Sequence, residues 1–126
     1  MDQKLLILVT YHAKPGRGRE FLREIEKHGL RETILKEDGC LRYDYYLASD
    51  TDDTVLLVEQ WQTPAHQSAH MAQAHMKTLL ELKNREILST DVQKYLNHIH
   101  TGGPCGSKLF MNHRIYDSVH RFQSCF

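Results

Sequence analysis

The sequence predicts an α+β protein with a ferredoxin-like fold, in which the order β-α-β-β-α-β places two helices on one face of an antiparallel sheet. Four segments have the length and the apolar or β-branched content of strands: residues 4–13, 40–48, 54–61 and 92–99. Helical periodicity separates the first strand from the second and the third from the fourth. The chain of 126 residues suits one such domain and a tail.

The first strand is apolar on both faces. Period-two alternation over residues 4–13 puts Leu5, Ile7, Val9 and Tyr11 on one face, and Leu6, Leu8, Thr10 and His12 on the other. We expect both faces to be largely buried in the native protein.

A helix is predicted from residue 18 or 19 towards residue 37. At about 100° per residue, one stripe contains Phe21, Leu22, Ile25 and His28, whereas Leu30 and Ile34 fall on another. The two stripes do not line up, and Gly29, which lies between them, is the expected point of interruption, since glycine lets the backbone deform at low cost. This spacing predicts that His28 lies on the core-facing side of the helix.

The second and third strands form a predicted hairpin, because only residues 49–53 connect them. Alternation in the second strand gives one face made of Leu41, Tyr43, Tyr45 and Leu47. One face of the third strand consists of Val55, Leu57, Glu59 and Trp61. A carboxylate therefore lies beside the chain's only tryptophan.

The next helix begins at Thr63 and Pro64, which supply an N-cap oxygen and a φ suited to the first turn. On an unbroken helix His70 and His75 would diverge by about 140°. If both face one pocket, the helix breaks between Met71 and Ala74. It then continues to residue 83 or 84.

The first and third strands are apolar on both faces, whereas two helices can cover only one face of the sheet. The second face needs a further layer, which the sheet of an identical chain supplies most economically. The sequence therefore predicts a homodimer.

Composition excludes several classes of protein. The formal net charge is zero, so no basic excess points to nucleic acid as a partner. No apolar run approaches the roughly 20 residues of a membrane span, and no secretory signal precedes the first strand, so we expect a cytoplasmic protein without a membrane partner. The 3 cysteines form no CxxC pair, which argues against a disulfide framework or a thiolate zinc site.

Residues 1–100 form the predicted domain, and residues 101–126 form a C-terminal extension. A Gly- and Pro-containing connector at 102–106 precedes apolar residues with helical spacing, namely Ile115, Val119, Phe122 and Phe126. The extension is either a short amphipathic helix docked on the domain or a frayed terminus.

Three motifs occur in the segments ILKEDGCLRYDYY (34–46) and VLLVEQWQTPAHQSAHMAQAHMKTLLE (55–81): E-x-G-C-x-x-Y, E-x-W and A-H-x-x-A-H-x-x-x-x-H-M. They resemble the antibiotic biosynthesis monooxygenase family, specifically its small quinol monooxygenase branch. The resemblance extends from Leu5 to about Ile99 and implies a dimeric α+β barrel. It also implies oxidation of aromatic or polyphenolic substrates by O2 without metal or flavin. The family contains an isomerase of a phosphorylated dione and haem-degrading members too, so the resemblance leaves the reaction open.

The implied partners are a small aromatic or quinone-like substrate and O2, with no cofactor. Oxidation of a quinol requires a base or hydrogen-bond acceptor for the hydroxyl, and an apolar slot that holds the anion and oxygen together. The candidates for acid–base catalysis are His28, Glu59, His70 and His75. The candidates for substrate binding are Trp61, Tyr43, Tyr45, Met71 and Met76.

Two other functions stay open on the sequence alone. One is an isomerase or other non-oxidative enzyme acting on a small carbonyl compound in the same pocket, and the other is a non-catalytic dimer that binds a small ligand. A tryptophan at a strand end is more often a core anchor than a functional group, and Glu59 could pair across a dimer contact. His66 and His70 have the i, i+4 spacing of metal ligands but lack a third partner, so we expect no metal site.

Overall fold

A computed structural model describes residues 3–98 of the chain, and the predicted C-terminal extension lies outside these residues. The described elements are β1 (Gln3–Ala13), α1 (Gly18–Lys27), α2 (Leu30–Leu35), β2 (Cys40–Leu47), β3 (Thr54–Trp61), α3 (Pro64–Met71), α4 (Met76–Glu86) and β4 (Ile87–His98). The order of strands and helical regions is the predicted one.

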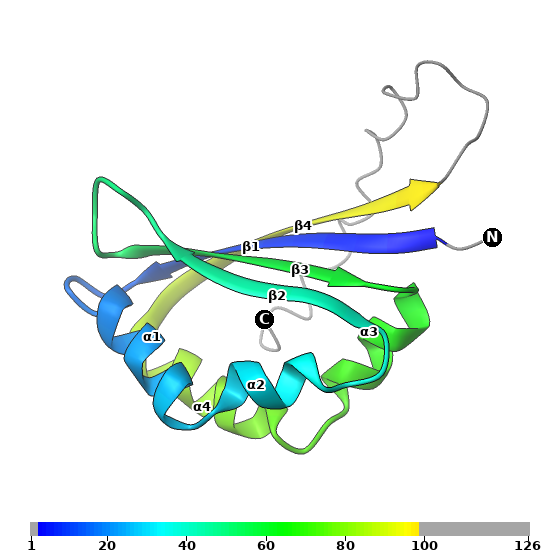
Figure 1. Ribbon diagram of the computed structural model, residues 1–126. Helices are drawn as coiled ribbons and strands as arrows, with labels where there is room; N and C mark the ends of the chain where they lie inside the picture. Colours follow the sequence, from blue (N-terminus) through cyan, green and yellow to red (C-terminus); the bar gives the residue numbers. More distant parts are fainter. Residues whose placement is uncertain (1–2, 99–126) are drawn as a thin grey trace.

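The strands form one antiparallel sheet in the order β2-β3-β1-β4. The central strand β1 pairs with both β3 and β4, so that Ile7 lies between Glu59 on one side and Lys94 on the other. All described helices lie on one face of this sheet (Figure 1). The predicted ferredoxin-like α+β fold is therefore confirmed, including the hairpin between β2 and β3.

Both predicted helices are broken where the sequence placed a break. Gly29 separates α1 from α2 with a φ of +65°, a left-handed conformation that glycine adopts without a steric penalty. Residues 72–75 separate α3 from α4. At the start of α3, the Thr63 hydroxyl accepts a hydrogen bond from the backbone N–H of His66, and Pro64 occupies the first turn. Each crossing over the sheet thus consists of two short helices.

Two predicted features of the strands were wrong. β4 begins at Ile87 rather than Val92, because the chain passes from α4 into the strand without a loop, and Ile87 is already extended with φ −109° and ψ 133°. Leu41 does not join the inner face of β2. A register shift between Cys40 and Arg42 marks a β-bulge there, and Leu41 is left 46% exposed.

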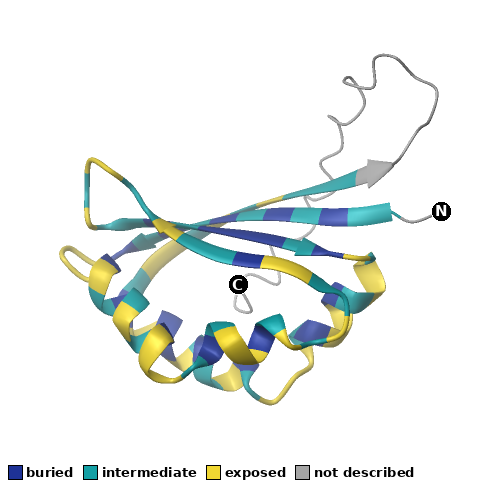
Figure 2. Cartoon of the chain, in the orientation of Figure 1, coloured by how far each residue is buried: buried dark blue, intermediate teal, exposed yellow. Residues whose placement is uncertain are grey.

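The inner face of the sheet and the apolar stripes of the helices form the core (Figure 2). The alternation predicted for β1 and β3 is confirmed, because the predicted inner-face residues are all buried: Leu5, Ile7, Val9 and Tyr11 from β1, and Val55, Leu57, Glu59 and Trp61 from β3. Helix α1 adds Phe21 and Ile25, and α4 adds Leu79 and Leu82. Glu59 is therefore held within a largely apolar layer.

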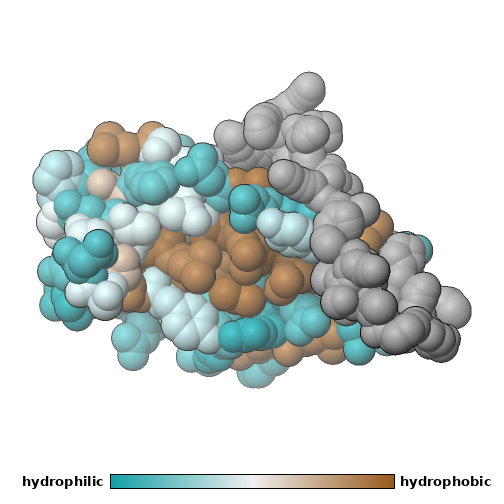
Figure 3. All heavy atoms as spheres, turned by 90° about the horizontal axis from the view of Figure 1, so that it is seen from above, coloured by the Kyte–Doolittle hydropathy of each residue, from teal (hydrophilic) through white to brown (hydrophobic). Residues whose placement is uncertain are grey.

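The opposite face of the sheet carries no described helix and presents an apolar patch (Figure 3). We define the open-face patch as Leu6, Leu8, Leu56 and Val58. The β1–β3 register brings these residues together, with Leu8 directly opposite Val58. A sheet face of this kind favours association with another apolar surface. Among the described helices, none has both the length and the apolar character that a membrane crossing requires.

Gly39, in the turn before β2, should be less tolerant of a side chain than Gly16. Its φ is +82°, and an added Cβ would overlap the imidazole ring of His66. Gly16 has a similar φ of +77° with nothing within 4 Å of an added Cβ, so it reports the cost of the backbone conformation alone. We expect Gly16→Ala to lower the free energy of unfolding by about 1–2 kcal/mol, and Gly39→Ala by at least about 1 kcal/mol more. Urea denaturation measures both losses, and equal losses would contradict the close contact with His66.

Candidate functional site

Glu59 and Trp61 form a buried polar pair on the inner face of β3. Glu59 is 1% exposed, and its Oε1 accepts a hydrogen bond of 2.9 Å from the indole Nε1 of Trp61. Burial raises the pKa of Glu59 to about 7, although the indole hydrogen bond and the positive charges of Lys94 and Lys83 oppose this shift. The carboxyl group can therefore exchange a proton near neutral pH, which suits a general acid or base.

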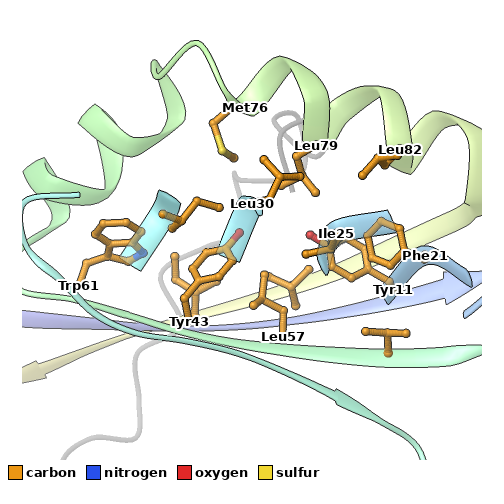
Figure 4. Close-up of a cluster of buried hydrophobic side chains, with 14 of the residues drawn as sticks. Tyr11, Phe21, Ile25, Leu30, Tyr43, Leu57, Trp61, Met76, Leu79 and Leu82 are labelled. Carbon is orange, nitrogen blue, oxygen red and sulfur yellow. The ribbon is translucent and has the colours of Figure 1, made fainter. Parts of the chain in front are cut away.

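Three tyrosines line the same layer. Tyr43 lies opposite Glu59 in the β2–β3 register, and its ring packs edge-on against Tyr45 with the centroids 5.7 Å apart. Tyr11 and Tyr43 extend from the sheet towards the helices (Figure 4). Burial raises the pKa of all three hydroxyls, so they stay protonated. The Tyr11 hydroxyl is buried without a hydrogen-bond partner among the described residues, so a polar group of a ligand could satisfy it.

A second group, the Glu37 cluster, consists of Glu37, His70 and His75. Nδ1 of His70 lies 3.0 Å from each carboxylate oxygen of Glu37, and Nε2 of His75 lies 2.6 Å from Oε2. Glu37 follows α2, His70 lies near the end of α3, and His75 is the last residue before α4. The break between α3 and α4 resolves the angular conflict predicted for His70 and His75, because it lets both rings reach one carboxylate.

His70 connects the Glu37 cluster with the buried pair. Its ring stacks on Trp61 with the centroids 4.6 Å apart and packs edge-on against Tyr43 at 5.7 Å. Burial lowers the pKa of His70, while the hydrogen bond and negative charge of Glu37 act in the opposite direction. The His70 ring thus contacts both the Trp61 indole and the Glu37 carboxylate.

The Glu37 cluster borders a pocket of about 410 Å³ between the end of α2 and the α3–α4 segment. Its lining residues are Thr33, Lys36, Glu37, Asp38, Ala65, His66, Ala69, Gln73 and His75. This volume falls within the range of small-molecule sites. Glu59 and Trp61 are not part of this lining. Within residues 3–98, two places could therefore support chemistry: the buried layer and this outer pocket.

The predicted core-facing position of His28 is wrong. His28 caps the C-terminus of α1, its side chain is 41% exposed, and Nδ1 lies 2.9 Å from the carbonyl oxygen of Glu24 one turn earlier. The helical stripe ends before His28, because the helix itself ends there and the left-handed Gly29 redirects the chain. His28 therefore does not converge with Glu59 and Trp61.

The two methionines predicted to bind substrate lie in or beside the core, and His66, which was not predicted as a site residue, lies outside it. Met76 is buried in the core and points into the layer (Figure 4), whereas Met71 is partly buried at its edge. His66 lies outside the Glu37 cluster, with Nδ1 2.8 Å from the Thr63 hydroxyl and Nε2 3.4 Å from Asp38. Sequence reasoning missed Glu37 as a site residue. The only signal for it was its place as the first residue of the E-x-G-C-x-x-Y motif.

The fold and the buried layer define a small α+β protein of ferredoxin-like topology, with a carboxyl group of raised pKa among aromatic side chains. A family model described as antibiotic biosynthesis monooxygenase matches residues 5–82. The chain belongs to this family.

Known relatives agree with this assignment. The probable quinol monooxygenase YgiN of Escherichia coli (strain K12) is 30% identical over 97 residues, which cover 71% of this chain and 93% of the relative. A solved structure from Nitrosomonas europaea has a TM-score of 0.69 at 20% identity, covering 81% of this chain and 97% of that chain. The structure of PA3566 from Pseudomonas aeruginosa has a TM-score of 0.67 at 20% identity, covering 82% and 98%. These structures share the fold.

The raised pKa of Glu59 predicts an unusual pH dependence of stability. In the unfolded chain the carboxyl has its ordinary pKa of 4.5, against about 7 when folded. The native state therefore binds the Glu59 proton more tightly than the unfolded chain does. Proton binding adds fully to the free energy of unfolding below pH 4.5, and this stabilisation is lost as the pH rises through 7. Gln keeps an acceptor for Trp61 without the charge. We expect the free energy of unfolding of Glu59→Gln, relative to wild type, to rise between pH 5 and pH 8 by on the order of 3 kcal/mol. Denaturant titrations at both pH values measure this change, with the exposed Glu81→Gln as the control; an equal response in the two variants would contradict the assignment.

Proposed function

We propose that the protein is a cytoplasmic monooxygenase that oxidises a small aromatic, quinol-type substrate with O2, without a cofactor, in the layer between the sheet and the helices. The observation that carries this proposal is the buried carboxyl group of Glu59, whose pKa of about 7 allows proton transfer in an otherwise apolar, aromatic layer. Family membership and the relative named as a quinol monooxygenase support the reaction type.

A quinol suits an enzyme without a cofactor because the substrate itself supplies the electrons. In the balanced reaction, a quinol and O2 yield a hydroxyquinone and water. One oxygen atom enters the ring and the other leaves as water, and all the electrons that reduce O2 come from the quinol. The protein must then remove a hydroxyl proton, keep the anion and O2 together, and exclude bulk water.

Glu59 is the group that we assign to proton removal. Oε1 is engaged by the indole N–H of Trp61, so Oε2 is the atom assigned to the substrate hydroxyl. The protonated hydroxyls of Tyr11, Tyr43 and Tyr45 are assigned as donors to the substrate or to reduced oxygen.

Trp61 and Met76 are assigned as apolar walls, on the sheet side and the helix side respectively, and the partly buried Met71 lies at the edge. His70 acts as a positioning residue, since its ring supports the indole of Trp61. The catalytic role predicted for His75 stays a prediction, because this side chain borders the outer pocket rather than the buried layer.

Oxygen uptake tests this proposal directly. Wild-type protein is given a panel of quinols while dissolved oxygen and product mass are followed. We expect one substrate to consume O2, with kcat/KM rising as the pH increases through about 7, where the Glu59 carboxylate forms. Glu59→Gln should lower kcat by at least about a hundredfold, whereas Glu81→Gln should retain wild-type activity.

Three outcomes would contradict the proposal. Product formation without oxygen uptake would favour the non-oxidative alternative, isomerase chemistry on a carbonyl compound. Saturable ligand binding without turnover would favour a binding protein. Unchanged kcat in a folded Glu59→Gln variant would remove the acid–base role from this carboxyl group.

We further propose that two chains associate through their open-face patches, an arrangement that the apolar character of both sheet faces favours. Sedimentation at low micromolar concentration should give two chains per particle. Leu8 lies on β1, between β3 and β4, so Leu8→Asp places a charge within the open-face patch and should shift the protein towards monomer. Leu88→Asp alters an exposed leucine outside the patch, 65% exposed, and should leave the dimer intact. A monomeric wild-type protein, or a Leu8→Asp variant as dimeric as wild type, would contradict this interface.

A further inference from the structure

We propose that Glu37, His70 and His75 form a binding site for a divalent first-row transition-metal ion such as Zn²⁺ or Co²⁺. This goes beyond the proposed oxidation, because the site does not include Glu59 and meets the Glu59–Trp61 pair only through the stacking of the His70 ring on the indole. It also departs from the expectation that the protein binds no metal, since that expectation rested on His66 and His70, which had no third partner. In the structure His70 lies near His75 instead, and Glu37 provides the third ligand.

The donor set fits such an ion. Two imidazole nitrogens of intermediate softness and one hard carboxylate oxygen form a set that zinc, cobalt, nickel and ferrous iron accept. One donor atom from each of the three side chains lies within 4.8 Å of the others. An ion about 2.0–2.2 Å from each donor would hold them roughly 3–3.5 Å apart. The contacts of 3.0 Å and 2.6 Å to Glu37 are close to that separation, and the two histidine nitrogens, which lie within 4.8 Å of each other, would move together on binding.

The site is held in place before any ion arrives. The His70 side chain is 1% exposed and packed between Trp61 and Tyr43, and that of Glu37 is 9% exposed. The side chain of His75 is 23% exposed and borders the outer pocket, which gives an ion a route of entry and leaves room for a water molecule as a further ligand. His70 and His75 are each hydrogen-bonded to Glu37, and a bound ion would replace the protons in these hydrogen bonds.

The ion would connect parts of the chain that are distant in sequence. Glu37 is 33 residues from His70 and 38 from His75. The ion would therefore tie the turn after α2 to both sides of the break between α3 and α4. An ion that binds only the native arrangement stabilises it by mass action. Metal binding should thus raise the melting temperature, a readout independent of enzymatic activity.

The test uses the full chain, stripped with a chelator and then titrated with Co²⁺ and Zn²⁺. We expect one equivalent of metal per chain by calorimetry, visible d–d absorption with Co²⁺, and a higher Tm with either ion. Glu37→Gln and His75→Ala should each weaken the affinity at least about tenfold and abolish most of the rise in Tm. His66→Ala is the matched control, because His66 lines the same pocket but lies outside the Glu37 cluster. This variant should bind like wild type.

Absence of saturable binding by wild type would overturn the proposal. Wild-type affinity in both Glu37→Gln and His75→Ala would also overturn it, since the ion would then be bound elsewhere on the chain. Circular dichroism verifies that the two variants are folded. Oxygen uptake by the stripped protein is measured separately, so failure of the metal site and failure of the proposed oxidation can be distinguished.

Discussion

The hydrogen bond from the Trp61 indole to the Glu59 carboxyl is the interaction on which the layer between sheet and helices depends. A carboxyl group in an apolar layer is costly unless it is hydrogen-bonded or protonated, and here both occur near neutral pH. The indole is supported by His70, and His70 and His75 both contact the carboxylate of Glu37. A continuous line of contacts therefore runs from the centre of the core to the outer pocket.

The two helix breaks determine which side chains can meet. An unbroken helix through residues 64–86 would direct His70 and His75 away from each other. At the break between α3 and α4, the backbone N–H groups of Ala72 and Gln73 bond to carbonyls three residues back, and the change in direction brings both rings to Glu37. The break at Gly29 has the opposite effect on the first helical region, because it ends α1 and leaves His28 at an exposed cap. The positions of the helix ends, more than helical periodicity, therefore explain why His70 and His75 lie together while His28 lies apart from them.

Much of the fold followed from local rules, because strand alternation depends only on neighbouring residues. That alternation placed Glu59 and Trp61 on the buried face correctly. The start of β4 was missed, because the polar residues 89–91 concealed a strand that follows α4 directly. The predicted position of His28 was wrong, because helical periodicity predicts which side of a helix a residue faces but not the residue at which the helix ends. Glu37 could not be assigned to a site from its own surroundings, since its partners lie 33 and 38 residues further along the chain.

The direct passage from α4 into β4 has a consequence for how the chain can change in length. Glu86 ends the helix and its backbone carbonyl oxygen accepts a hydrogen bond from the N–H of Lys14, while its side chain binds Arg17. An insertion between Glu86 and Ile87 would separate the helix from its anchor on the β1–α1 turn and shift every residue of the edge strand β4. The turn at 48–53 between β2 and β3 is also attached, but only in its second half, where Asp53 accepts hydrogen bonds from the backbone N–H groups of Ala13 and Gly16 and Asp52 pairs with Arg19. Variation in length among related chains should therefore accumulate in the first half of the hairpin turn, residues 49–51, and be excluded from the junction after α4.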